Sequence, residues 1–167
     1  MTDDELMRSC RDGSEEAFGH LFERHRAAIW SFFRRRVADR ARAEDLSQDT
    51  FLALLKSAPR YESRDAFRSY LFGIAYNVLS DDRRRPGADN RGGVDPATLS
   101  APAADLNEVL HVRRAVSALD PIDRDVVLLR EFESLSYADI AELLAIPVNT
   151  VRSRLFRARM ALKEKLQ

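Results

Sequence analysis

One segment near the middle of the chain lacks the apolar periodicity that a single continuous core would need. Residues 86–104 hold three of the six glycines and three of the six prolines and show no apolar periodicity. Because Gly and Pro break helices and strands, this segment is predicted to be a flexible linker. The chain is therefore expected to form two small domains, residues 1–85 and residues 105–167, each large enough for a minimal helical core.

Both predicted domains carry a helical spacing of apolar residues and almost no strand pattern. Apolar side chains recur at steps of three and four, and residues that start helices, such as Ser14 and Ser136, precede them. Helices are predicted over residues 4–11, 14–33, 40–57 and 65–84, and over residues 106–119, 122–132, 140–144 and 150–166. The predicted fold class is all-α, with two small helical domains joined by a flexible linker.

Two local features of these helices are also expected. The buried side of the helix over residues 40–57 should carry Leu46, Thr50, Leu54 and Leu55. In the second domain, Asp120 and Asn149 are predicted to cap the helices that follow them, with Pro121 at the first helical position after Asp120.

Composition excludes several classes of protein. No apolar run approaches the roughly 18 residues of a membrane span, and the acidic start is unlike a signal peptide, so a cytoplasmic protein without membrane insertion is expected. A single cysteine excludes an internal disulfide. Cys10, His20, His25 and His111 lack the spacing of metal ligands. With no phosphate-binding glycine loop and no catalytic triad, we expect neither an enzyme nor a cofactor.

The cations of the chain are clustered although its net charge is zero. Residues 24–42 contain seven arginines and one acid, and residues 149–165 contain six cations and one acid. This asymmetry on a balanced chain is typical of a protein that binds nucleic acid or another acidic surface.

The last two predicted helices match a helix-turn-helix, in which the second helix is strongly basic. The small Ala141 lets the two helices approach closely, and Pro147 lies in the turn between them. Arg152, Ser153, Phe156 and Arg157 share one exposed arc, and arginine suits the guanine edge in the major groove. The alternative is a solvated basic helix in an ordinary bundle.

Two patterns in the first domain admit a functional and a structural interpretation. One face of a predicted helix carries Glu44, Asp45, Gln48 and Asp49. This face either docks to a basic protein helix or is an ordinary solvated polar face. Residues 61–76 hold five of the fourteen aromatics, interleaved with arginines. Rings and cations in this arrangement bind single-stranded nucleic acid, but the same rings can form a core.

Three motifs in a fixed order resemble a known family. They are Ala43–Phe51, Phe67–Asn77 followed by Asp82–Arg84, and Ser136–Leu144 followed by Thr150–Arg159. Together they are similar to bacterial RNA polymerase sigma factors of the extracytoplasmic-function (ECF) group. The resemblance covers nearly the whole chain, apart from the first dozen residues and the linker.

The resemblance implies a two-domain initiation factor. Residues 1–85 would form the sigma region 2 domain, which docks on core RNA polymerase and reads and melts the −10 element as single-stranded DNA. Residues 105–167 would form the region 4 domain, which reads the double-stranded −35 element. The implied partners are core polymerase, through its β′ clamp and β subunits, promoter DNA and an anti-sigma protein.

The resemblance also assigns site residues, motif by motif. Those for polymerase docking are Asp45, Leu46, Gln48 and Asp49. Those for the −10 element are Tyr61, Arg64, Phe67, Tyr70, Asn77, Arg83 and Arg84. Those for the −35 element are Asn149, Thr150, Arg152, Ser153, Arg154, Phe156, Arg157 and Arg159.

The residues alone leave two other functions open. A stand-alone helix-turn-helix transcriptional regulator, such as a dimeric repressor, would need a dimer surface and an effector pocket, which the acidic face does not supply. A purely protein-binding adaptor would leave the arginines between Arg152 and Arg159 unexplained.

Overall fold

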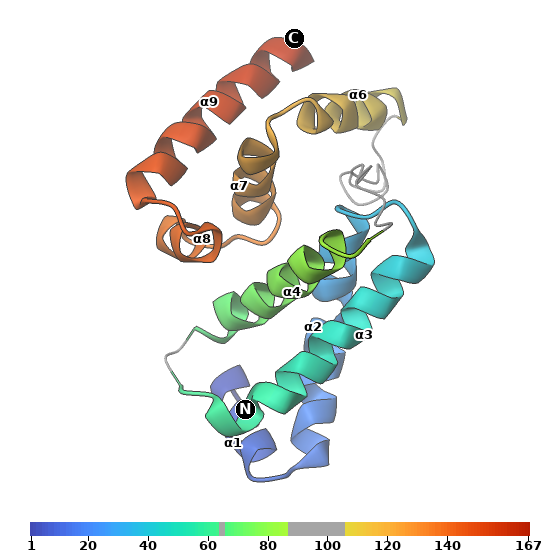
Figure 1. Ribbon diagram of the computed structural model, residues 1–167, viewed down its shortest axis with the longest axis vertical. Helices are drawn as coiled ribbons and strands as arrows, with labels where there is room; N and C mark the ends of the chain where they lie inside the picture. The colour runs from blue at the N-terminus through green and yellow to red at the C-terminus, as the bar shows by residue number, and fades with distance from the viewer. Residues whose placement is uncertain (64–65, 87–105) are drawn as a thin grey trace. The chain divides into compact units, whose positions relative to one another are not determined.

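The computed structural model describes residues 1–63, 66–86 and 106–167 (Figure 1). Every regular element within those ranges is a helix, which confirms the all-α class. The chain divides into two compact units, one of Met1–Phe33 with Asp39–Asn90 and the other of Arg34–Ala38 with Arg91–Gln167. The predicted linker, residues 86–104, lies outside the described residues except for Pro86.

The helices of the first unit follow the predicted ones closely. They are α1 (Asp3–Arg11), α2 (Glu15–Arg34), α3 (Arg40–Ser57), the short 3₁₀ helix η1 (Ala58–Arg60) and α4 (Phe67–Arg83). The start of α1 is a capping box, in which the Glu5 amide donates to Thr2 Oγ1 at 3.2 Å and the Thr2 amide donates to Glu5 Oε2 at 2.7 Å. Neither this box nor η1 is among the predicted features.

The core of the first unit is aromatic and aliphatic. Figure 1 shows α3 and α4 side by side, and α1 lies against η1. Phe32 of α2 is fully buried, with its ring centroid 5.0 Å from Phe33 and 5.8 Å from Phe72 of α4. Leu46, Thr50 and Leu54 line the inner side of α3 as expected, but Leu55 is 44% exposed, so its assignment to that side was wrong.

The second unit contains the helix-turn-helix. Its helices are α6 (Leu106–Ser117), α7 (Pro121–Glu131), α8 (Tyr137–Leu144) and α9 (Val148–Leu166). Helix α9 packs against α6, α7 and α8. Its buried residues are Val151, Leu155 and Ala158, spaced at steps of four and three. This spacing seats one face of α9 in the unit and leaves the opposite face to solvent.

Of the three predicted caps in this unit, Ser136 is confirmed with its side-chain hydrogen bond, and Asp120 occupies the N-cap position without one. Ser136 Oγ accepts the Asp139 amide at 3.1 Å and starts α8. Asp120 makes no side-chain capping bond within the described residues, although Pro121 occupies the first turn. Asn149 is not the cap of α9 either: the helix begins at Val148, and Pro147 supplies the extended N-cap conformation. Ala145, at φ 56°, ends α8 in the left-handed conformation.

A buried ionic cluster belongs to the second unit. Glu133, which has no exposed surface, accepts hydrogen bonds from Arg36 at 2.8 and 3.1 Å and from Arg35 at 2.9 Å. Burial by itself would raise the pKa of Glu133, but the two guanidinium groups hold the pKa below its usual range. The carboxylate is therefore charged and paired.

Candidate nucleic-acid and protein-binding surfaces

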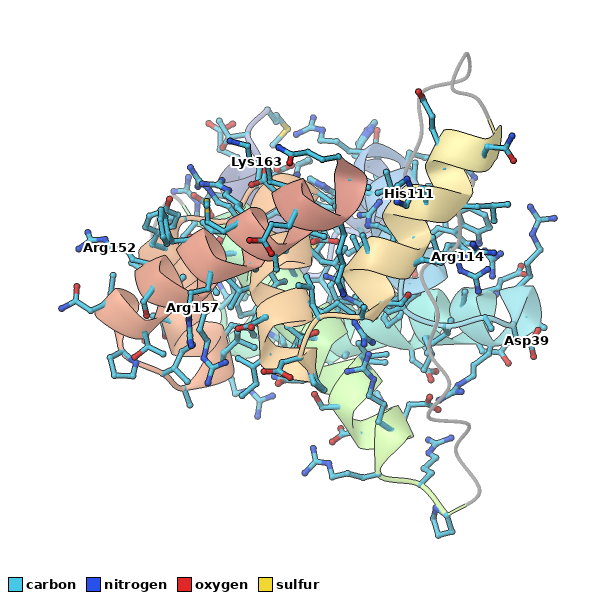
Figure 2. All side chains as sticks on the ribbon, turned by 90° about the horizontal axis from the view of Figure 1, so that it is seen from above. Asp39, His111, Arg114, Arg152, Arg157 and Lys163 are labelled. Atoms are coloured by element: carbon cyan, nitrogen blue, oxygen red, sulfur yellow. The ribbon has the colours of Figure 1, made fainter. Side chains whose placement is uncertain are left out.

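The outward face of α9 is cationic and carries an exposed aromatic ring. Arg152, Ser153 and Arg157 are exposed, and Phe156 between them keeps 67% of its surface accessible. Figure 2 shows Arg152, Arg157 and Lys163 distributed along the helix. A ring that contributes nothing to the core, set among cations on one helix face, is suited to contact with an anionic partner that also offers apolar groups.

The first turn of α9 is organised by local polar contacts. Arg152 Nη1 donates to Asn149 Oδ1 at 3.2 Å, and Ser153 Oγ donates to the Thr150 carbonyl at 3.2 Å. No side chain within the described residues caps this helix end. The backbone amides of the first turn and the helix dipole therefore favour an anion there, such as a phosphate.

Arg154 and Arg159 have a different environment from the arginines of the outward arc. Arg154 Nη1 lies 3.0 Å from Asp123 Oδ1, and Arg159 forms an ion pair with Glu131. Both acids belong to α7. The hydrogen bond to Glu131 raises the pKa of Arg159. Arg154 and Arg159 stay candidates for the −35 element, but to contact a phosphate each would have to share or exchange its carboxylate partner.

On α3, a stripe of exposed residues begins with polar side chains and ends with apolar ones. Asp45, Gln48 and Asp49 are exposed, as is Glu44 beside them. Leu46, which the sequence analysis placed in the same site, is only 4% exposed and belongs to the core. Its side chain therefore holds α3 to the unit.

The stripe on α3 continues beyond the predicted site. Leu52 and Leu55 are 53% and 44% exposed. They follow Gln48 at four and seven residues, which is the repeat of one helix face. The period of Asp45 and Gln48, continued along the sequence, leads to both leucines, and the prediction that groups Leu55 with the core is wrong.

The aromatic cluster of the first unit is mostly internal. Tyr61 is 5% exposed, Phe67 4% and Phe72 2%, whereas Tyr70 and Tyr76 are half-buried. The Tyr61 ring lies 5.0 Å from Tyr70 and 6.4 Å from Phe67, both edge-on. In this conformation, Tyr61 and Phe67 pack inside the unit, and Tyr70 is partly accessible at the surface.

The remaining −10 candidates lie along α4. Asn77 and Arg83 are exposed, and so is Arg84, which pairs with Asp81 at 2.7 Å. Arg68 stacks over the Phe72 ring at 4.9 Å. Arg64 lies outside the described residues. The exposed part of this candidate site is thus made by α4, with cations toward its C-terminal end.

No other chemistry emerges from the described residues. They contain no group of three or more His, Cys, Asp or Glu side chains that could hold a metal ion. Cys10 is buried, and burial raises the pKa of its thiol. Among the helices of the described ranges, none is long and apolar enough to cross a membrane.

Two sequence families match the chain, one mainly in its N-terminal half and one in its C-terminal half. The family described as Sigma-70 region 2 matches residues 21–88, and the family described as Sigma-70, region 4 matches residues 110–162. Between them, these matches include α3, α4, α8 and most of α9.

Similar proteins cover the whole chain. It is 33% identical over 165 residues to the RNA polymerase sigma factor CarQ of Myxococcus xanthus, with 96% of this chain and 95% of CarQ aligned. It is 32% identical over 183 residues to the ECF RNA polymerase sigma-E factor of Haemophilus influenzae, with 100% and 96% aligned.

Solved structures agree with these relatives. The chain is similar to the sigma factor RpoE in its co-crystal structure with the anti-sigma factor NepR from Bartonella quintana, at TM-score 0.73 and 25% identity over 89% of this chain and 96% of that one. It is also similar to CnrH in complex with the cytosolic domain of CnrY, at TM-score 0.71 and 26% identity over 98% and 96%. The chain belongs to the ECF group of RNA polymerase sigma factors.

Proposed function

We propose that this protein is a transcription initiation factor that binds core RNA polymerase and directs it to promoters with a −10 and a −35 element. The observation that carries the proposal is the outward face of α9, where Arg152, Ser153, Phe156 and Arg157 are exposed on the second helix of a helix-turn-helix. That face has the shape and charge for the major groove.

The side chains on α9 contact different parts of the −35 element. Arg152 and Ser153 lie in the first two turns, the part of a recognition helix that meets base edges. Arg157 is five residues further, about 140° around the axis, so it addresses a different part of the groove. Phe156 offers an apolar surface to a thymine methyl group. The amide end of α9 faces a phosphate.

Helix α3 is the proposed docking surface for core polymerase. Asp45, Gln48 and Asp49 present acids and an amide to a basic helix of the β′ clamp, and Leu52 and Leu55 add apolar surface along the same stripe. Exposed leucines beside charged groups are typical of a protein interface, in which an apolar centre is flanked by complementary charges.

Helix α4 is the proposed surface for the −10 element. The half-buried ring of Tyr70 is available for stacking, Asn77 offers hydrogen bonds to a base, and Arg83 and Arg84 attract phosphates. These groups suit a single strand better than a duplex because stacking requires an unpaired base. The protein would thereby stabilise the melted strand.

The function requires binding and no catalysis, and it places the protein in the cytoplasm with polymerase and chromosome. The two similar solved structures are complexes, one with an anti-sigma factor. On this likeness we include an anti-sigma protein among the partners of this chain. A stand-alone helix-turn-helix regulator is not favoured, since both family matches and full-length sigma factor relatives fit the chain.

The proposal is tested by co-elution with core polymerase and two charge-reversed variants. Asp45→Arg/Asp49→Arg should abolish co-elution, because like charges facing each other at an interface cost several kcal/mol. The matched control, Glu16→Arg/Glu23→Arg, reverses two exposed acids on α2 and should bind normally. Co-elution of the first variant at normal affinity, with unchanged helical circular dichroism, would mean that α3 does not dock.

A further inference from the structure

Helix α1 has no role in the function described above, and it precedes the region 2 match, which begins at residue 21. It nevertheless contacts residues of the −10 candidate site. The Tyr61 hydroxyl donates a hydrogen bond to the Asp4 carboxylate, and both side chains are buried, at 5% and 6% exposure. A carboxylate taken out of water needs such partners.

A second path leads from α1 to Phe67. Asp3 Oδ2 lies 3.1 Å from His25 Nε2 of α2, and Asp3 Oδ1 accepts a hydrogen bond from Arg24 at 2.8 Å. The His25 ring then packs on Phe67, with a distance of 5.1 Å between ring centroids. Asp4 therefore contacts Tyr61 directly. The adjacent Asp3 lies against His25, and the His25 ring packs on Phe67.

The structure of α1 fixes the positions of Asp3 and Asp4. Its capping box fixes the first turn, in which Asp3 and Asp4 lie, and the positive end of the helix dipole favours carboxylates there. Burial and the neighbouring carboxylate raise the pKa of Tyr61, so its hydroxyl keeps the proton that it donates. Tyr61 in turn packs edge-on against Tyr70, the aromatic side chain that reaches the surface.

We infer that Asp4 is a positioning residue for the −10 element: through its hydrogen bond to Tyr61 it fixes the rings of Tyr61 and Tyr70, so that Tyr70 can stack on a single-stranded base. This inference rests on the proposed function. Asp4 touches no DNA itself; it acts through Tyr61. Without an acceptor at this position the buried hydroxyl loses its partner, and the Tyr61 ring becomes free to move away from Tyr70.

The test compares variants of the full chain bound to core polymerase. Asp4→Leu removes the acceptor, Tyr61→Phe removes the donor, and Asp4→Asn keeps a carbonyl oxygen that can accept. The control is Asp12→Leu, at the exposed C-terminal end of α1. For each holoenzyme we would measure affinity for a single-stranded −10 oligonucleotide and for a −35 duplex.

Asp4→Leu and Tyr61→Phe should each weaken single-strand binding by up to about tenfold, because losing one buried hydrogen bond can lower the population of the binding-competent ring position by that factor. The double variant should be no weaker than either single variant because both remove the same bond. Asp4→Asn should restore affinity, Asp12→Leu should match the unaltered protein, and −35 binding should be the same throughout.

Normal single-strand binding by both Asp4→Leu and Tyr61→Phe would overturn the inference, as would a loss in Asp4→Asn equal to that in Asp4→Leu. An equal loss on the −35 duplex would also overturn it, because the hydrogen bond would then only stabilise the chain. Failure of the proposed function would look different: the unaltered holoenzyme would show no preference for the single strand.

Discussion

The arginines of α9 are chemically alike but differ in their neighbours. Arg152 and Arg157 lie on the exposed arc, whereas Arg154 and Arg159 pair with Asp123 and Glu131 of α7. Because a carboxylate fixes a guanidinium and occupies its donors, the paired arginines are less available to base edges and would meet a phosphate only by sharing or exchanging that carboxylate. The exposed ones keep donors for base edges.

The first prediction concerns Arg152. Arg152→Ala should relax the preference for one or two bases of the −35 element at a cost of about 1–3 kcal/mol, since it removes donors to base edges. Arg159→Ala should weaken all sequences alike. Transcription of a library randomised in the −35 element measures both effects. A uniform loss in Arg152→Ala together with a changed base preference in Arg159→Ala would reverse the orientation assigned to α9.

The second prediction concerns Glu131. Glu131→Gln should strengthen binding to every DNA duplex and steepen the salt dependence by up to about one released counterion, because Glu131 no longer competes with phosphate for Arg159. Both side chains of the pair are about half exposed, so stability should change by no more than about 1 kcal/mol. Fluorescence anisotropy at several salt concentrations measures the slope. Unchanged affinity and an unchanged slope would show that Glu131 does not compete with DNA for Arg159.

Sequence reasoning about single residues succeeded where partners are near in the chain and failed where they are distant. The exposed arc of Arg152 and Phe156 follows from helical spacing alone. Whether Tyr61 is core or surface could not be settled from sequence, because its hydroxyl partner Asp4 lies 57 positions away. The same holds for Glu133, whose partner Arg36 lies 97 positions away.

At the scale of the element, helix limits depend on how each end is satisfied. Helix α3 has the predicted limits because Asp39 provides a real cap, its carboxylate accepting the Ala41 amide at 3.0 Å. At α9 the strong capping preference of Asn149 was misleading. Pro147 already has the extended backbone of an N-cap, so the helix begins at Val148 and the Asn149 side chain accepts from Arg152 instead.

The third prediction concerns the start of α8. This helix has only eight residues, so its single side-chain cap carries weight. Ser136→Ala should cost about 0.5–2 kcal/mol, because the Asp139 amide loses its acceptor. Thermal unfolding followed by circular dichroism should show a lower midpoint for this variant. Ser136→Asp keeps an acceptor and should unfold like the unaltered protein; equal stability of Ser136→Ala would show that the cap contributes nothing.

At the scale of the whole molecule, the proposed −10 surface on α4 and the proposed −35 surface on α9 belong to different units, and residues 86–104 lie between these two helices in the sequence. Residues 86–104 remain a predicted linker. As a flexible coil, 19 residues have a root-mean-square span of about 22–26 Å. Fully extended they reach about 63–68 Å. The number of residues in the segment gives these spans directly, whereas the arrangement of the units does not follow from the sequence.

The fourth prediction concerns that length. Deleting eight residues from 86–104 should leave both units folded and abolish transcription, because the −10 and −35 surfaces could no longer reach their elements together. Replacing the same eight residues with Gly and Ser should preserve activity. Circular dichroism checks folding, and normal transcription by the shortened chain would mean that the units need not engage both elements at once.

We propose that this chain gives core RNA polymerase its promoter specificity. Run-off transcription with purified core polymerase, on a library randomised at both promoter elements, tests it most directly. We expect core polymerase alone to yield no specific transcripts, and the reconstituted holoenzyme to select templates that share one −10 and one −35 sequence. No selection by the holoenzyme, together with duplex binding by the free chain as a stable homodimer, would mean that the chain is not a sigma factor for these promoters.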